Sequence, residues 1–402
     1  MPKIKITEID NTGVVQSGII SNTVYIPGKV VSTGDAEEPK LFTSISQLRD
    51  YNYTNYSSTG TNTPLHYDDA SLSYKLMEHL LTLGMYVLYE GIKEASEGVA
   101  PTIDWTRLED KGLYDIRFLT MGEYGVVQAG MLSCAEHRGD CVALLDHPTT
   151  LETQGATQAL KVRAYFEGFK SGNTSYSAAF TPGFKTQLET LGGSSTTPKH
   201  IPASFGYLFA YAKSVQANPD WYAVAGGQRG IIPELSEVEY NYTSADIEVL
   251  QGRAKTGEVP LDDDADNVGC AINPIAYVRP FGYIIWGNRT FKENDAVKKT
   301  TATSFLNVRN LVSAVKKSMY NAARKYTFEP NSDMLWVNFK SQIIPLLDQL
   351  KNGNGIFGYK FVKLATTAKA RLKARLIIIP IEAVEDFELE IELNDTISTT
   401  EE

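Results

Sequence analysis

The sequence is poor in cysteine and has no long apolar run. Three cysteines, Cys134, Cys141 and Cys270, occur in 402 residues. They are too few for a disulfide framework, so we expect folding in a reducing cytoplasm. No stretch approaches the roughly 20 apolar residues that span a bilayer, and the N-terminus MPKIKITEID lacks an apolar signal core. Neither secretion nor membrane insertion is therefore expected.

Recognisable catalytic signatures are also missing. There is no G-x-S-x-G nucleophile elbow, and the five histidines form no known catalytic pattern. The glycine-rich segment Gly226–Gly230 is not followed by the Lys-Ser/Thr pair of a nucleotide phosphate loop. We therefore predict no catalytic residues and no cofactor.

Two segments resemble parts of metal sites without completing them. Cys134, His137, Cys141 and His147 lie close in sequence, but structural zinc favours cysteine pairs with two to four intervening residues and here there are six. The acidic run that starts at Asp262 lacks the glycine and the closing glutamate of a calcium loop. Burial of Cys141 in a strand and a solvated acidic turn are the favoured interpretations, with no metal.

Basic residues are outnumbered by acidic ones, 38 to 48, but they are concentrated in one region. The net charge of −10 argues against nucleic acid as the main partner. Nevertheless no Asp or Glu lies between Asp295 and Glu329. The basic residues in or just before that span are Arg289, Lys298, Lys299, Arg309, Lys316, Lys317, Arg324 and Lys325. The heptad spacing within Arg309, Lys316, Lys317 and Arg324 predicts a common helix side, which is either a solvated surface or a docking surface for an acidic partner.

The two ends of the chain alternate between apolar and charged residues. Near the C-terminus the apolar set is Phe387, Leu389, Ile391 and Leu393, and the interleaved acidic set is Glu388, Glu390 and Glu392. Near the N-terminus Ile4 and Ile6 alternate with Lys3 and Lys5. A period of two predicts strands with one apolar face. Because a lone terminal strand readily pairs with another sheet edge, we expect both ends to be donated to neighbouring subunits.

Between the ends, helix and strand patterns alternate from about residue 23 to 270 and predict an α/β layer architecture. Pro27-Gly28 is expected to form a turn, and Asp68 or Asp69 to cap a helix that ends before Gly84. Later in the chain, the apolar spacing over residues 303–326 predicts a long helix. Asn331 is expected to cap a second helix, which extends through Leu350. Strands are expected around 358–364 and 371–379, with Leu376–Ile379 buried.

With these elements in place, the sequence resembles the contractile tail sheath proteins of bacteriophages and related injection machines. Three segments carry the resemblance most strongly: NPIAYVRPFGYIIWGNRT (273–290), FLNVRNLVSAVKKSMYNAARKYTFEPNSDMLW (305–336) and LDQLKNGNGIFGY (347–359). Looser agreement comes from RGDCVALLDHP (138–148), IPASFGYLFAY (201–211) and DWYAVAGGQRG (220–230), where Val224 replaces the usual proline.

The resemblance implies a multidomain chain. Residues 1–22 form an N-terminal arm, 23–270 an outer α/β domain, 271–383 an inner α/β domain and 384–402 a C-terminal strand arm. It further implies stacked six-fold rings of this chain around a tail tube, with baseplate and tail terminator proteins as further partners. The tube is driven through the cell envelope when the sheath contracts, without nucleotide hydrolysis. Arg309, Lys316, Lys317 and Arg324 are candidates for facing the tube.

The expected location is the virion tail, with assembly in the host cytoplasm, and direct contact with nucleic acid is not expected. Two alternatives stay open at this point. One is the sheath of a tailocin, an extracellular injection system or a secretion apparatus. The other, an α/β enzyme, makes no use of the paired termini or of the basic helix.

Overall fold

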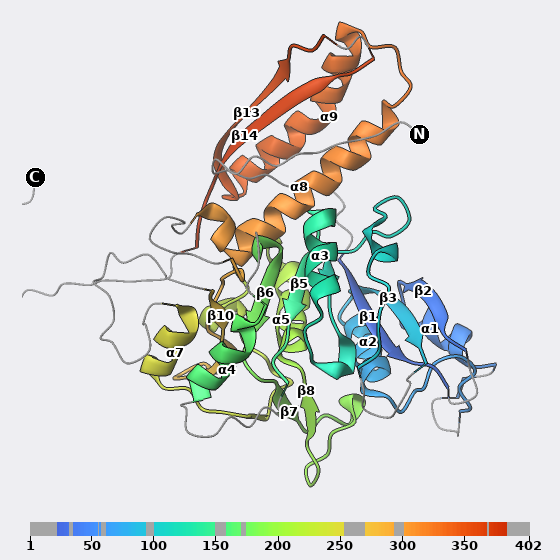
Figure 1. Ribbon diagram of the computed structural model, residues 1–402, viewed down its shortest axis with the longest axis vertical. Helices are drawn as coiled ribbons and strands as arrows, with labels where there is room; N and C mark the ends of the chain where they lie inside the picture. Colours follow the sequence, from blue (N-terminus) through green and yellow to red (C-terminus); the bar gives the residue numbers. More distant parts are fainter. Residues whose placement is uncertain are drawn as a thin grey trace, which may run out of the picture.

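The computed structural model describes residues 22–31, 35–54, 56–57, 62–93, 100–148, 158–169, 174–252, 270–292, 301–367 and 370–383. They form two units: a body (22–292) built on a large sheet, and a helix–hairpin unit (301–383) that projects from it (Figure 1). The predicted strands around Ile4–Ile6 and Phe387–Leu393 lie outside the described residues. Among the described helices, none is long and apolar enough to cross a membrane.

The body is organised around a seven-stranded sheet in the order β10-β6-β5-β4-β1-β3-β2. All neighbours pair in parallel except β2, which is antiparallel to β3. The strands are β1 (Thr23–Lys29), β2 (Glu37–Phe42), β3 (Tyr86–Ile92), β4 (Phe118–Leu119), β5 (Val142–Leu145), β6 (Ser177–Phe180) and β10 (Ile272–Asn273). The α/β architecture predicted from the alternating pattern is confirmed.

Helices cover both faces of this sheet. Alternate residues of β1 point to opposite faces, so Val24 joins a core with α2 and α5, whereas Tyr25 joins a second core with α3 and α4. The body helices are α1 (Ile45–Asn52), α2 (Leu72–Thr82), α3 (Ala129–Arg138), α4 (Gln158–Glu167), α5 (Ala203–Ala217), α6 (Gly226–Arg229) and α7 (Ser244–Gln251). Both faces of the sheet are therefore covered by buried apolar side chains.

Two smaller sheets flank the main one. Strands β7 (Phe184–Thr186), β8 (Lys199–Ile201) and β9 (Glu237–Val238) form a three-stranded antiparallel sheet in the order β8-β7-β9. Strands β11 (Ile275–Val278) and β12 (Gly282–Ile285) form a hairpin. Because β10 completes the large sheet and Phe291 is buried in one of its cores, the domain boundary predicted at residue 270 lies too early.

The helix–hairpin unit starts with a short 3-10 turn, Ala302–Ser304, followed by the two long helices α8 (Leu306–Lys325) and α9 (Asp333–Asn352). Strands β13 (Ile356–Leu364) and β14 (Lys373–Pro380) then pair antiparallel. One hairpin face packs on α9, where the Phe361 ring lies 5.0 Å from Trp336 and 6.0 Å from Phe339 between ring centroids. Both predicted helices and both predicted strands are confirmed.

Three local predictions are wrong. Strand β1 continues through Pro27-Gly28 instead of turning. Proline has no N–H to donate, but β4 pairs only with Val24 and Tyr25, so no hydrogen bond to β4 is lost at Pro27. The side chain that caps α2 is Ser71, which accepts a hydrogen bond from the N–H of Tyr74. Similarly, Ser332, not Asn331, caps α9.

The aliphatic cluster Leu376–Ile379 is not a buried strand. Ile377 and Ile379 are 45% and 58% exposed, since only the alternate residues of β14 face α9. The outer face of the hairpin therefore presents apolar side chains to solvent.

Candidate functional site: the junction of helix α8 with the sheet

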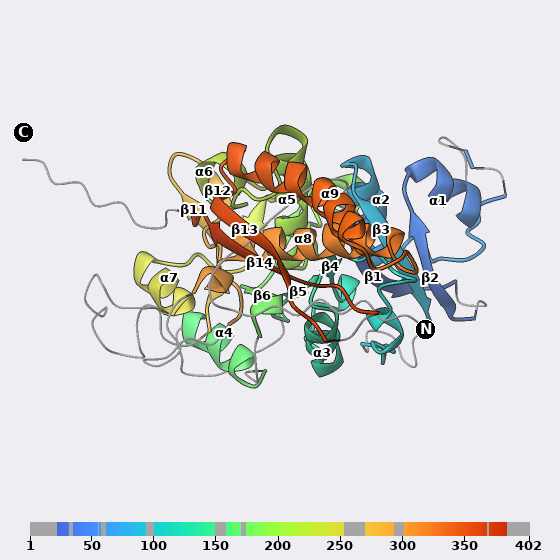
Figure 2. The same cartoon turned by 90° about the horizontal axis from the view of Figure 1, so that it is seen from above.

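Helix α8 lies across the amino-terminal ends of β4, β5 and β6, and we call this contact the junction (Figures 1 and 2). The first half of the helix is buried from Leu306 to Val315 on all sides, whereas its last turns extend away from the body. A helix held along half its length transmits the position of the projecting unit directly to the sheet. The polar contacts at the junction decide how firmly it is held.

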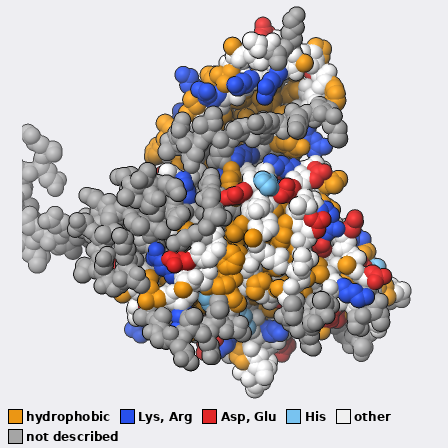
Figure 3. Space-filling model, viewed as in Figure 1, with side chains coloured by type: hydrophobic (Ala, Val, Ile, Leu, Met, Phe, Trp, Pro, Cys, Tyr) orange, Lys and Arg blue, Asp and Glu red, His pale blue; other side chains and the backbone are white. Residues whose placement is uncertain are grey.

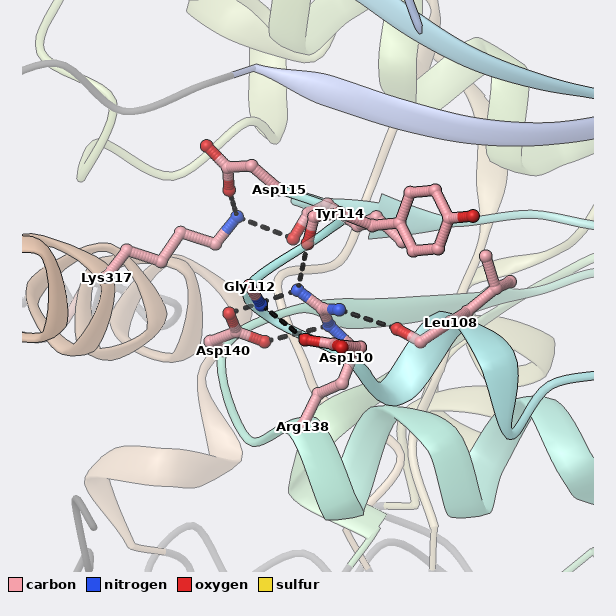
Figure 4. A network of polar contacts seen from close by, with 9 residues as sticks. Leu108, Asp110, Gly112, Tyr114, Asp115, Arg138, Asp140 and Lys317 are labelled. Atoms are coloured by element: carbon pink, nitrogen blue, oxygen red, sulfur yellow. Dashed lines mark hydrogen bonds and ion pairs between the residues drawn. The ribbon is translucent and has the colours of Figure 1, made fainter. Parts of the chain in front are cut away.

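Lys317 anchors α8 to the segment that precedes β4. Its Nζ donates to the backbone oxygen of Ile116 at 2.6 Å and pairs with the carboxylate of Asp115 (Figure 4). Burial lowers the pKa of Lys317, while the negative charges of Asp140 and Asp115 oppose that shift. The ammonium is therefore held in the interior by a carboxylate and a carbonyl.

Arg138, next to this lysine site, secures the loops beneath it. Its guanidinium makes two hydrogen bonds to Asp140, at 3.0 and 3.2 Å. It also donates to the backbone oxygens of Leu108 and Tyr114 at 2.6 and 2.9 Å (Figure 4). A buried bidentate pair of this kind fixes geometry, so the carboxylate below α8 cannot rotate away.

Arg309 and Lys316 hold α8 to the start of β6. Arg309 donates to the Ser175 hydroxyl at 2.8 Å, and its guanidinium carbon lies 4.2 Å from the centroid of the Tyr176 ring. Lys316 donates to the Tyr176 hydroxyl at 2.7 Å. Both cations thus share one aromatic side chain, in cation–π and hydrogen-bond contact.

Asparagines complete the junction on the side of α5. Asn310 donates to the Tyr207 hydroxyl at 2.8 Å, and Asn307 donates to the backbone oxygen of Trp221 at 3.1 Å. Neither asparagine was singled out from the sequence. Their spacing of three residues along α8 matches one helix side, which is the signal that could have found them.

The basic residues predicted for an exposed helix surface divide into two groups. Arg309 and Lys317 are only 1% and 7% exposed, so an exposed docking or solvated surface is wrong for these two. The acidic partner of Lys317 is Asp115 of the same chain. Arg324, in the last turn of α8, is exposed, and a contact with another protein stays a prediction for that residue.

The residues considered for zinc are dispersed. Cys134 and Cys141 are buried free thiols, and burial raises the pKa of Cys141 to about 11. The ring of His147 packs on Tyr165, whereas His137 points outward to Glu109, at 2.9 Å between Nδ1 and Oε1. Within the described ranges, no group of three or more histidine, cysteine or acidic side chains could hold a metal ion.

A second feature is the charge of the helix–hairpin unit. Residues 306–381 contain thirteen Lys or Arg and three Asp or Glu, a net charge of +10 in a chain of net −10. Figure 3 shows basic side chains gathered on this unit. On the outer hairpin face Lys360, Lys373 and Arg375 are exposed beside Ile377 and Ile379. This surface is both basic and apolar, unlike the acidic remainder of the chain.

Comparisons with solved structures identify this arrangement. The chain superposes on a subunit of the PVC sheath complex of an extracellular contractile injection system in its contracted state, with a TM-score of 0.63 and 16% identity over 98% of both chains. The chain has the fold of a contractile sheath subunit. The sheath fold is also matched, with a TM-score of 0.63 and 15% identity, by a chain in the six-fold symmetrised baseplate of the anti-feeding prophage, over 98% of this chain and 99% of that chain.

Sequence comparison agrees with the sheath fold. The tail sheath protein of Vibrio phage KVP40 is 22% identical over 256 residues, which cover 60% of this chain and 34% of the phage protein. The chain thus spans about a third of the length of that curated relative. No protein-family model matches the sequence. The resemblance to contractile sheath proteins inferred from the sequence motifs is confirmed.

Proposed function

We propose that the protein is the structural subunit of a contractile sheath, which assembles as stacked six-fold rings around a tube and shortens to drive that tube through a cell envelope. The observation that carries the proposal is the match of the whole chain, body and helix–hairpin unit together, to a sheath in the contracted state. Relatives of this kind are structural proteins, so no catalytic step and no nucleotide are assigned. The free energy for contraction would lie in the difference between two packings of the subunits.

The two kinds of relative are matched over different shares of their length. This chain is covered almost end to end by injection-system sheaths but matches only 34% of the phage KVP40 protein. A sheath of an extracellular injection system or tailocin is the second candidate beside a phage tail sheath, in which case the virion location would not apply.

The junction supports a division of labour within the subunit. The body, residues 22–292, would form the outer part, and the helix–hairpin unit would face the tube. Arg324, exposed near the end of α8, stays a candidate tube contact. Lys316 and the buried Arg309 and Lys317 would instead hold the two units together, so that a displacement of the tube-facing side moves the body as well. Baseplate and terminator proteins would bind the ends of the stack.

Strand donation would link the subunits. Within the described residues β13 and β14 form a sheet of only two strands, and such a sheet has edges to which further strands can add. The apolar set Ile4, Ile6, Phe387, Leu389, Ile391 and Leu393 would extend its buried face in adjacent copies. The charged set Lys3, Lys5, Glu388, Glu390 and Glu392 would disfavour wrong pairings.

Electron microscopy of the purified protein tests the proposal. We expect striated tubes from the full chain, and short or absent tubes from a variant that lacks residues 387–402 but keeps the circular dichroism of the full chain. Addition of ATP should leave tube length unchanged. Failure of the full chain to polymerise, alone or with its tube protein, would refute the sheath function, and ATP-dependent shortening would refute the stored-energy account.

A further inference from the structure

We propose that, in the free subunit, the C-terminal segment 382–402 docks on the edge of β14 of its own chain and thereby blocks the receiving site until assembly begins. The docking itself is a property of the monomer. Its consequence, that neighbouring copies must exchange this segment before they can be linked, rests on the proposed function.

The receiving surface is the free side of the hairpin. Strand β14 pairs with β13 along one edge, and no described strand pairs with its other edge. An unprotected strand edge with apolar neighbours readily recruits another strand. Two exposed isoleucines, Ile377 at 45% and Ile379 at 58%, lie on the hairpin face opposite α9. The site is thus incomplete in the described chain.

Charge selects the occupant. The hairpin with its flanks, residues 353–381, contains six Lys or Arg and no Asp or Glu. The segment 382–402 contains nine Asp or Glu and no Lys or Arg. Opposite net charges on two parts of one chain favour their encounter and suppress other partners. Among the remaining stretches of the sequence, this one joins a strong negative charge to a strand-like alternation.

The point where the described chain ends puts the segment within reach. The N–H of Ile381 donates to the oxygen of Gly355 at 3.2 Å, so the chain is still at the base of the hairpin when β14 has ended. Residues 381–386 can then form a six-residue connection to a strand at 387–393. Such a strand runs antiparallel to β14, and antiparallel neighbours in sequence need only a short connection.

The side-chain pattern fits this register. With that connection, Leu389 comes opposite Ile378, which faces α9, and Glu392 comes opposite Arg375 on the outer face. The apolar parity thus extends the buried face of the hairpin. Of the acidic parity, Glu392 lies beside Arg375 and diagonal to Lys373, whereas Glu388 and Glu390 come opposite Ile379 and Ile377. A shift by one residue would place the glutamates against α9 and the apolar residues outside.

Docking within one chain competes with docking between chains. A short connection gives the tethered segment an effective concentration in the millimolar range, far above the concentration of free subunits. The monomer therefore fills its own site, and neighbours gain access only where many copies are held together. A growing ring on a baseplate, or a high concentration of purified subunits, provides that condition, so only subunits that are free at low concentration stay unpolymerised.

Peptide binding tests the proposal. The probe is a fluorescent synthetic peptide of residues 384–402, and its anisotropy is measured with the full chain and with a chain ending at Ala383, at concentrations where sedimentation velocity shows monomers. We expect binding to the shortened chain and at least about ten-fold weaker binding to the full chain. Arg375→Glu should weaken binding to the shortened chain, whereas the matched control Lys340→Glu, exposed on α9, should not.

Disulfide cross-linking shows whether the docked segment belongs to the same chain or to a neighbouring chain. A chain with Arg375→Cys and Glu392→Cys should give an intrachain disulfide in a yield independent of protein concentration, because the three native cysteines that could interfere are buried. Equal peptide affinity for both chains, no binding to the shortened chain, or an interchain product only would each overturn the proposal. Tube formation is measured separately. If docking is absent but tubes form normally, this proposal fails and the sheath function stands. If docking is present but the full chain forms no tubes, only the sheath function is refuted.

Discussion

The indole Nε1 of Trp221 donates a hydrogen bond to the backbone oxygen of Gly353 at 2.8 Å. Trp221 belongs to the body, yet its side chain lies in the core of the helix–hairpin unit with Leu350 and Ile356. A side chain at Gly353 would bring Cβ within 2.5 Å of the Trp221 ring, so the glycine permits this close approach. The two units are therefore joined by a second contact besides the junction under α8.

Trp221→Ala should weaken this second contact. Removing a buried tryptophan leaves a cavity and an unpartnered carbonyl, which typically costs about 3–5 kcal/mol of the free energy of unfolding. Urea denaturation followed by circular dichroism measures the loss. Trp221→Phe, the matched control, keeps an aromatic ring but loses the donor and should cost about 1–2 kcal/mol. Equal costs for the two variants would show that the ring packing contributes little.

Lys317→Met should destabilise the junction by about 1–3 kcal/mol, because the oxygen of Ile116 loses its donor in a buried position. The side chain of Asp115 is half exposed, so water compensates most of its lost partner. The yield of sheath tubes should fall as the junction becomes less stable. Thermal unfolding and the yield of tubes are the two measurements.

Lys325→Met provides the comparison for this position. Lys325 lies on the same helix but is exposed, so its replacement should change the free energy of unfolding by less than about 0.5 kcal/mol. If Lys317→Met were equally harmless, the buried lysine would not secure the helix to the sheet.

His147 makes the body sensitive to mild acid. Burial lowers the pKa of His147 to about 4, below the value of about 6.5 in an unfolded chain. The folded state therefore binds fewer protons between these values, and stability is fully present above pH 6.5 and falls as the pH drops toward 4. The full loss, about 3 kcal/mol, is reached below pH 4, and about 2 kcal/mol of it falls between pH 7 and pH 4.5. His147→Phe should remove most of this loss, as denaturation midpoints at pH 7 and pH 4.5 would reveal.

His137 offers a control of opposite sign. It is exposed, and its hydrogen bond to Glu109 raises the pKa of His137. Its contribution is present below the unfolded pKa and is lost as the pH rises through the folded value. His137→Gln should therefore not relieve the acid sensitivity. Relief by both variants would point to a general charge effect instead of the buried ring.

Strong periodic patterns in the sequence were sufficient to predict the long elements. The helix predicted over 303–326 and the alternating α/β region match α8 and the parallel sheet because both depend on local spacing. Gly28 shows where local chemistry misleads. It lies within β1, and a Cβ there would fall 1.8 Å from the Tyr89 hydroxyl. Glycine is therefore required at this position by the close approach of Tyr89, which is distant in sequence, and not by a turn.

The junction could not be predicted from the same patterns. Arg309 and Lys317 looked like surface residues because charge on a helix is usually solvated, and their partners Ser175 and Asp115 lie 134 and 202 residues away in sequence. Only the tertiary structure brings such groups together. The pattern that predicted a docking surface was useful in one respect, since Lys317 does pair with a carboxylate, but within its own chain.

Reversing the charges of the hairpin should stop assembly, and reversing those of the C-terminal segment should restore it. Lys373→Glu with Arg375→Glu places carboxylates on the outer face of β14, where the segment 387–393 brings its own glutamates, and like charges in cross-strand positions are destabilising. We expect few or no tubes in electron micrographs. Adding Glu390→Lys and Glu392→Lys should return tubes with the same striation. Lys340→Glu with Lys351→Glu, a matched double reversal at exposed positions of α9, should assemble normally. Because tubes and chain folding are scored separately, a hairpin variant that folds and still assembles would show that this face does not receive the strand, and a failure of the combined variant to recover would show that charge does not set the pairing.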